Sequence, residues 1–167
     1  MASERYRQAM EWLYLVCVLV SGTAMVVITL IIPFGVFMRY AMHDAQSWPE
    51  PASVILMVLF SFVGAAAVYR ANGHIAVQAL LDAVRPRWRQ IMLWAVDACT
   101  AVTALFMLVY GVQLCLITRL QSIAEFPALS VGVTYLPIPV GGAVTLLFVA
   151  ERLLIGRPPQ AGEPAPH

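Results

Sequence analysis

Charged residues are scarce in this chain: 11% of its 167 residues are Asp, Glu, Lys or Arg, whereas 61% are apolar. A soluble domain of this length could not bury that much apolar surface in a single core. The formal net charge is only +1, so the chain lacks the basic surface that nucleic-acid binding requires. The composition therefore predicts an integral membrane protein with no soluble domain and no nucleic-acid partner.

Residues that hold metals and cofactors are also few. The three histidines, His43, His74 and His167, all lie outside the long apolar stretches, and the three cysteines lack the close spacings of metal or redox sites. Haem bound inside a four-helix bundle needs ligands that project from the helices, and catalysis needs several reactive groups in one place. We expect no catalytic, cofactor-binding or metal-binding residues and no enzyme activity; a haem-carrying membrane enzyme subunit is the weaker alternative.

What the chain has is four apolar stretches, each near or above the roughly 20 residues that cross hydrocarbon. They predict an all-α membrane protein, one domain over residues 1–157 with four transmembrane helices. The first stretch is too long for a signal-peptide core and is expected to be retained. Residues 158–167 are rich in proline and are expected to form a disordered tail. The predicted spans cover residues 12–38, 52–69, 90–118 and 134–154.

Arginine placement predicts the orientation, because arginine near short loops resists translocation across the membrane. Only Arg39 and Arg119 lie in the loops after the first and third spans. Both termini and the loop between the second and third spans are therefore expected in the cytoplasm. The other eight arginines, which all lie on that side, are Arg5, Arg7, Arg70, Arg85, Arg87, Arg89, Arg152 and Arg157.

The loop between the second and third spans contains a short amphipathic pattern at residues 74–84. Its apolar residues, including Leu80 and Leu81, recur at helical spacing, while polar residues beginning with His74 recur every fourth position. The segment is too short to span a membrane, and Pro86 should end it. It is expected to lie on the membrane surface or in a groove of a partner, with His74, Leu80 and Leu81 as candidate contacts.

The first outer loop leads into the second span with the signals of a helix start. Ser47 can cap the helix, Pro49 suits its first turn, and Glu50 suits the positive end of its dipole. Trp48 is expected at the headgroup level. Arg39 closes the first span, and an ion pair between Arg39 and Glu50 would tie the first two spans together.

Two further acidic residues are candidates for specific contacts. Asp97 lies six or seven residues into the third span, about 10 Å deep at roughly 1.5 Å per residue. It could reach the interface, pair with an arginine, or couple an ion to transport, and the last possibility would make the chain a self-sufficient small transporter. Glu125 in the second outer loop could pair with Arg119.

Several short motifs occur in a fixed order along the four spans. They are Arg39-Tyr40, Trp48 with Glu50, Gly64-Ala65-Ala66, Arg70 with Gly73-His74-Ile75, Leu80-Leu81, Pro86 and Pro137-Ile-Pro139-Val-Gly141. Taken in this order, they resemble the small membrane subunit of a tripartite ATP-independent periplasmic (TRAP) transporter over nearly the whole chain. Gln78 is a departure, since similar proteins often have an acidic residue there.

The resemblance implies a three-component, sodium-coupled importer of an organic acid in the bacterial inner membrane. In it a periplasmic binding protein delivers the substrate, and a large multi-span subunit holds the substrate and sodium sites and moves elevator-fashion. The small subunit would be a scaffold that braces the large one, in contact with membrane lipids. Arg39, Trp48, Glu50, Arg70 and Glu125 then become candidates for contacts with the partners.

Overall fold

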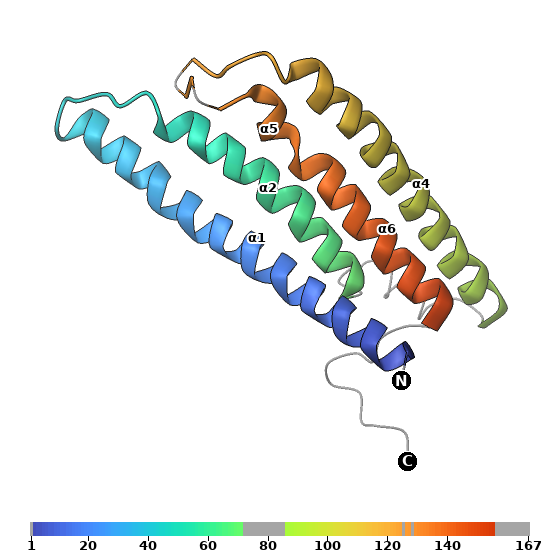
Figure 1. The fold of residues 1–167 in the computed structure, drawn as a ribbon. Helices are drawn as coiled ribbons and strands as arrows, with labels where there is room; N and C mark the ends of the chain where they lie inside the picture. Colours follow the sequence, from blue (N-terminus) through green and yellow to red (C-terminus); the bar gives the residue numbers. More distant parts are fainter. Residues whose placement is uncertain (1, 72–85, 125, 128, 156–167) are drawn as a thin grey trace.

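A computed structural model describes residues 2–71, 86–124, 126, 127 and 129–155 (Figure 1). Within these residues every regular element is a helix, and strand-like pairing is limited to one isolated bridge between Ser122 and Ser130. The predicted helix at 74–84 and the tail at 158–167 lie outside the described residues. The helices are α1 (Ala2–Tyr40), α2 (Pro49–Arg70), α4 (Pro86–Thr118), α5 (Val131–Tyr135) and α6 (Pro137–Ile155).

Four segments are long and apolar enough to cross a membrane, which confirms the predicted number of spans and makes the chain a multi-pass membrane protein. They are Arg5–Tyr40, Pro49–Arg70, Gln90–Thr118 and Val131–Leu154. The 39 residues of α1 continue through Pro33 and include the polar residues at the N-terminus. At about 1.5 Å per residue α1 is roughly 58 Å long, well beyond a hydrocarbon core of about 30 Å.

The four long helices lie side by side in the order α1, α2, α6, α4 (Figure 1). Each packs mainly on its neighbours in this row, and among the described residues α1 does not contact α4. The last span of the sequence is therefore inserted between the second and the third. Consistent with this central position, the fourth span is more deeply buried in the row than the third.

Two consecutive glycines allow α6 to approach both neighbours. A Cβ on Gly141 would lie 2.8 Å from the backbone oxygen of Phe62 in α2, and a Cβ on Gly142 would lie 2.8 Å from that of Ala104 in α4. Successive residues of a helix point about 100° apart, so the two glycines face different helices. Only glycine permits this backbone contact on both sides of α6.

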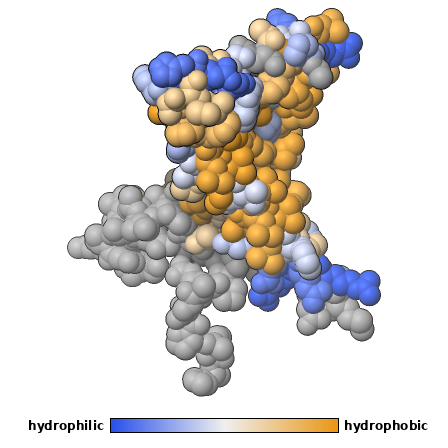
Figure 2. Space-filling view, turned by 90° about the vertical axis from the view of Figure 1, so that its left-hand side faces the viewer, coloured by the Kyte–Doolittle hydropathy of each residue, from blue (hydrophilic) through white to orange (hydrophobic). Residues whose placement is uncertain are grey.

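The row has two distinct ends. The end at which α1 and α4 begin and α2 and α6 end is called here the terminal end. The opposite end, with residues 41–48, 119–124 and 129–130, is called the loop end (Figure 1). The buried core lies in the terminal half, around Cys17, Ala66, Tyr69 and Phe148. Figure 2 shows hydrophobic residues over the middle of the molecule and hydrophilic residues at both ends, as expected of a membrane span.

Two helix starts differ in detail from the sequence predictions. The N-cap of α2 is Trp48, without a side-chain hydrogen bond, so Ser47 does not cap this helix; Pro49 does occupy the first turn. The fourth span begins at Val131 rather than at residue 134, because the hydroxyl of Ser130 accepts a hydrogen bond from the Gly132 backbone N–H at 3.1 Å. Pro137 then starts α6 directly after the short helix α5.

Candidate functional site

A buried pair of charges joins α2 to α6 at the terminal end. Arg70, the last residue of α2, donates from Nε to one carboxylate oxygen of Glu151 at 2.9 Å and from Nη2 to the other at 3.0 Å. Both side chains are largely buried, with 12% of Arg70 and 6% of Glu151 exposed. This two-point geometry fixes the relative position of the two helices more strictly than a single contact would.

A second pair joins α6 to α4. Nη1 of Arg152 lies 3.1 Å from Oδ1 of Asp97, and the Tyr69 hydroxyl of α2 donates to the same oxygen at 3.0 Å. The two partners of Asp97 therefore come from α6, the neighbour of α4 in the row, and from α2 on the other side of α6. Of the alternatives considered for Asp97, the structure shows the pairing with an arginine.

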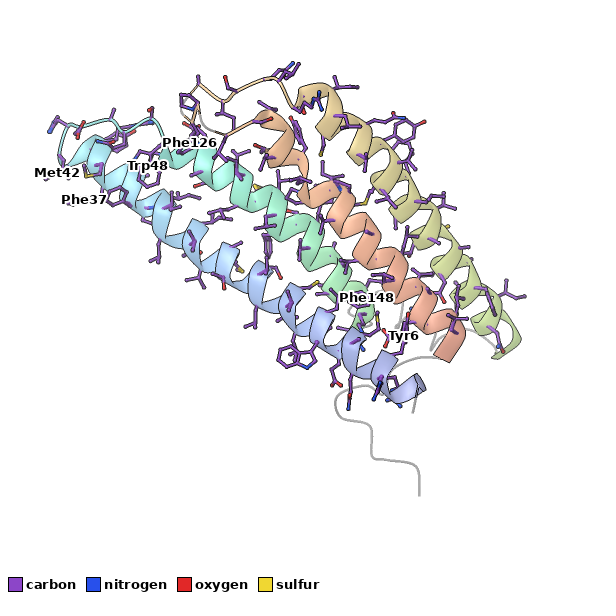
Figure 3. The ribbon with its side chains drawn as sticks, viewed as in Figure 1. Tyr6, Phe37, Met42, Trp48, Phe126 and Phe148 are labelled. Atoms are coloured by element: carbon purple, nitrogen blue, oxygen red, sulfur yellow. The ribbon has the colours of Figure 1, made fainter. Side chains whose placement is uncertain are left out.

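Aromatic rings complete the site and bring in α1. The Arg70 guanidinium carbon lies 5.3 Å from the ring centroid of Tyr14 in α1 and 5.5 Å from that of Phe148 in α6, and the Arg152 carbon lies 5.6 Å from the Tyr69 ring. These are cation–π distances, which favour a partly desolvated guanidinium. Figure 3 places Phe148 and Tyr6 at this end of the molecule.

We call these seven residues the terminal network: Tyr14, Tyr69, Arg70, Asp97, Phe148, Glu151 and Arg152. Its two cations and two anions compensate one another, and no buried side-chain N or O atom in the described part of the chain lacks a hydrogen-bond partner. The network thus links all four long helices at one level. Its geometry suits holding helices in place, because no charged member is left unpaired to exchange a proton or an ion.

No metal-binding group of histidine, cysteine and acidic residues occurs within the described residues. Cys17 is buried in the core, Cys115 is half-buried and Cys99 is exposed, and all three are free thiols.

The loop end holds a different arrangement of predicted residues. Arg39 and Glu50 both line a groove between α1 and α2, yet the predicted ion pair between them is not formed. Arg39 lies in the last turn of α1 and Glu50 in the first turn of α2, so the two residues lie on either side of the loop between these helices. Their charged groups do not come within ion-pair distance of each other. Trp48 packs on Phe34 of α1, with ring centroids 6.0 Å apart (Figure 3).

The structure therefore separates the candidate residues into two groups. Arg39, Trp48 and Glu50 lie at the loop end, whereas Arg70 and Asp97 lie in the terminal network. His74, Leu80, Leu81 and Glu125 lie outside the described residues, and so does the possible pair of Glu125 with Arg119.

Sequence reasoning missed Tyr69 and Glu151 as site residues and treated Arg152 only as a topology marker. A signal was present, because Glu151 is an acidic residue inside an otherwise apolar span and a carboxylate there needs a partner. Antiparallel spans bring Arg70, Asp97 and Arg152 to the same end. The pairings themselves depend on α6 lying between α2 and α4.

Residues 28–156 match the model of the family described as "Tripartite ATP-independent periplasmic transporters, DctQ component". The chain belongs to this family. It is also similar to a protein of Haemophilus influenzae named "Putative TRAP transporter small permease protein", with 21% identity over 126 residues that cover 75% of this chain and 78% of that protein. Membership confirms the resemblance to TRAP small subunits, and it makes the chain a component of a transporter.

The terminal network lies almost wholly inside the region that matches the DctQ family. Tyr69, Arg70, Asp97, Glu151 and Arg152 all fall within residues 28–156, and the groove residues Arg39 and Glu50 do as well. Tyr14 precedes the matched region. Both charged pairs therefore belong to the part of the chain that defines it as a family member.

Proposed function

We propose that this DctQ-family chain is the non-catalytic scaffold of a sodium-coupled importer of an organic acid. In this proposal a periplasmic binding protein delivers the acid, a large multi-span subunit holds the substrate and sodium, and this chain braces that subunit. Membership of the DctQ family supports the assignment to a TRAP transporter. The substrate class, the sodium coupling and the bracing role go beyond family membership and are part of the proposal.

The observation that carries the proposal is the terminal network. Arg70 with Glu151 and Arg152 with Asp97 join the three helices α2, α6 and α4 through buried, mutually compensated charges. A coupling site needs an ionisable group that can change its charge or its partner during transport. A scaffold needs the opposite, a set of helices held in fixed relative positions while a partner moves against them.

Arginine placement supports an orientation with both termini in the cytoplasm of a bacterial inner membrane. The terminal end contains Arg5, Arg70 and Arg152, whereas Arg39 and Arg119 lie at the loop end. Basic residues next to spans are retained on the cytoplasmic side. The loop end would then face the periplasm, where the binding protein docks.

The outer faces of the row offer surface for the large subunit and for lipids. Leu19 of α1 is 67% exposed and Val102 of α4 is 68% exposed, although both lie in the middle of their spans. A single row of helices leaves two broad apolar faces, and in a membrane these must contact lipid or another protein. Arg39, Trp48, Glu50, His74, Leu80, Leu81 and Glu125 stay predicted partner contacts.

Co-purification tests the proposal. The chain, tagged at one terminus, is expressed at its native level and extracted from its own membranes in a mild detergent. The scaffold role predicts that a second, larger multi-span membrane protein is retained together with the tagged chain in stoichiometric amount. Recovery of the chain alone, from membranes in which organic-acid uptake is active, would overturn the proposal.

A further inference from the structure

The groove at the loop end has the form of a lipid site. It lies between the outer halves of α1 and α2 and encloses about 400 Å³. Ile28, Ile32 and Met57 line the part of the groove nearer the middle of the two spans, and Arg39 and Glu50 line the part at the loop end, called here its mouth. Ligand sites of this size typically have apolar walls with a few polar groups that fix orientation.

The length of the groove matches one leaflet of a bilayer. Ile28 and Arg39 are eleven positions apart on α1, which is roughly 17 Å of helix, whereas half of a hydrocarbon core is about 15 Å. Tyr40 and Trp48 lie beside Arg39 and Glu50 along the chain, and such rings mark the headgroup level. The charged mouth is thus at headgroup depth, and the apolar part reaches toward the bilayer centre.

The floor of the groove is closed by helix contact. Gly35 and Pro49 both line it, and a Cβ on Gly35 would lie 3.1 Å from Cβ of Pro49. The two helices therefore touch behind the groove.

The mouth presents one cation and one anion that do not satisfy each other. Within the described part of the chain neither Arg39 nor Glu50 has an ion-pair partner, although both side chains line the same groove. The nearby acid Asp44 already accepts a hydrogen bond from Gln46 at 2.8 Å. A complementary ligand would carry a negative and a positive group close together at the top of an apolar chain.

We propose that this groove binds a phospholipid whose headgroup carries a primary ammonium, such as phosphatidylethanolamine. The phosphate binds the Arg39 guanidinium, because arginine donors suit phosphate oxygens, and the ammonium donates to the Glu50 carboxylate. One acyl chain lies along Ile28, Ile32 and Met57. An anionic lipid with an uncharged headgroup could satisfy Arg39 but would leave Glu50 facing a second negative group.

Lipid binding to the purified full-length chain tests this inference. The chain in detergent is titrated with dioleoyl phosphatidylethanolamine, phosphatidylcholine or phosphatidylglycerol, and bound lipid is counted by native mass spectrometry. Phosphatidylethanolamine should bind about tenfold more tightly than the other two, since each charge-assisted hydrogen bond is worth about that factor. Glu50→Gln should remove most of this preference, whereas Arg39→Gln should weaken all three lipids, because each carries the phosphate that Arg39 would bind. Met57→Trp should also weaken all three lipids by filling the groove.

Two controls carry the same changes of charge at exposed positions away from the groove. Arg119→Gln and Glu11→Gln should leave the lipid preference unchanged. Equal binding of the three lipids by the parent chain, or an unchanged preference for phosphatidylethanolamine in the Glu50→Gln chain, would overturn the inference. It would also be overturned if the Arg39 and Glu50 variants kept normal lipid binding but no longer retained a membrane partner on co-purification, because the groove would then be a protein docking site.

Discussion

Glu151 and Arg152 are consecutive residues of α6 and bind opposite neighbours, Glu151 the Arg70 guanidinium of α2 and Arg152 the Asp97 carboxylate of α4. Adjacent side chains of a helix point about 100° apart, so one dipeptide can reach both flanking helices. Gly141 and Gly142 repeat this arrangement nearer the loop end, with backbone contact in place of charge. Two pairs of adjacent residues thus fix α6 between α2 and α4.

Loss of one partner from the pair of Arg70 and Glu151 should strongly destabilise the folded chain. Glu151→Gln keeps the shape of the side chain but leaves the Arg70 guanidinium buried without a counter-charge, which costs about 3–5 kcal/mol. We expect a clearly lower Tm of the purified chain in detergent. The double variant Arg70→Met with Glu151→Leu should recover much of this loss, because it removes both charges from the buried site.

Glu11→Gln is the matched control for that experiment, since Glu11 is exposed on α1. Its Tm should stay within error of the parent chain. A Glu151→Gln chain as stable as the Glu11→Gln chain would show that the terminal network does not hold the row together.

Asp97 should prove to be a structural residue. Asp97→Asn removes the counter-charge of Arg152 and should lower the Tm and the amount of assembled transporter, whereas Tyr69→Phe removes one hydrogen bond and should cost only about 1 kcal/mol. Uptake per assembled complex should be unchanged by Asp97→Asn. Normal assembly combined with abolished uptake would instead indicate a coupling role.

The contact of α6 with α4 should not tolerate a side chain at Gly142. A Cβ there would lie 2.8 Å from the Ala104 backbone oxygen, whereas a Cβ on Gly22 would have no neighbour within 4 Å. Gly142→Ala should destabilise the chain by about 1–3 kcal/mol through overpacking. Gly22→Ala should be neutral or slightly stabilising, since alanine favours a helix more than glycine does. Equal Tm values for the two variants would contradict this packing.

The start of the fourth span depends on Ser130. Its hydroxyl accepts from Gly132 N–H at 3.1 Å and donates to the Arg119 carbonyl at 2.7 Å, so it caps α5 and ties it to the end of α4. Ser130→Ala should cost about 1 kcal/mol. Ser47→Ala is the control, because Ser47 precedes a helix that it does not cap. A larger loss of thermal stability for Ser47→Ala than for Ser130→Ala would contradict the assignment of Ser130, and not Ser47, as a helix cap.

The number of spans could be predicted from the sequence because hydrocarbon thickness requires about 20 apolar residues whatever the rest of the fold. The ends of the spans were less predictable. The start at Val131 depends on a serine cap that precedes the prolines, and α1 extends back to Ala2 because its first residues contain no helix breaker. The predicted capping role of Ser47 was wrong because the chain places Trp48 at that position.

The terminal network could be anticipated only in part. Pairing with an arginine was one of three possibilities for Asp97, but eight arginines lie on its predicted side of the membrane, and the sequence does not say which is close. The choice of Arg152 follows from the order of helices in the row, which depends on side-to-side packing rather than on local sequence. For the same reason Arg39 and Glu50, close along the chain, do not meet, while Arg70 and Glu151, far apart, do.

Reconstitution tests the scaffold assignment most directly. Liposomes are prepared with this chain alone, with the large membrane subunit alone, and with both, and organic-acid uptake is measured with the binding protein and a sodium gradient. The proposed function predicts uptake only with both subunits, and equal uptake per complex for Asp97→Asn. Ion-driven uptake by this chain alone, abolished by Asp97→Asn, would contradict the scaffold role and establish a self-sufficient transporter.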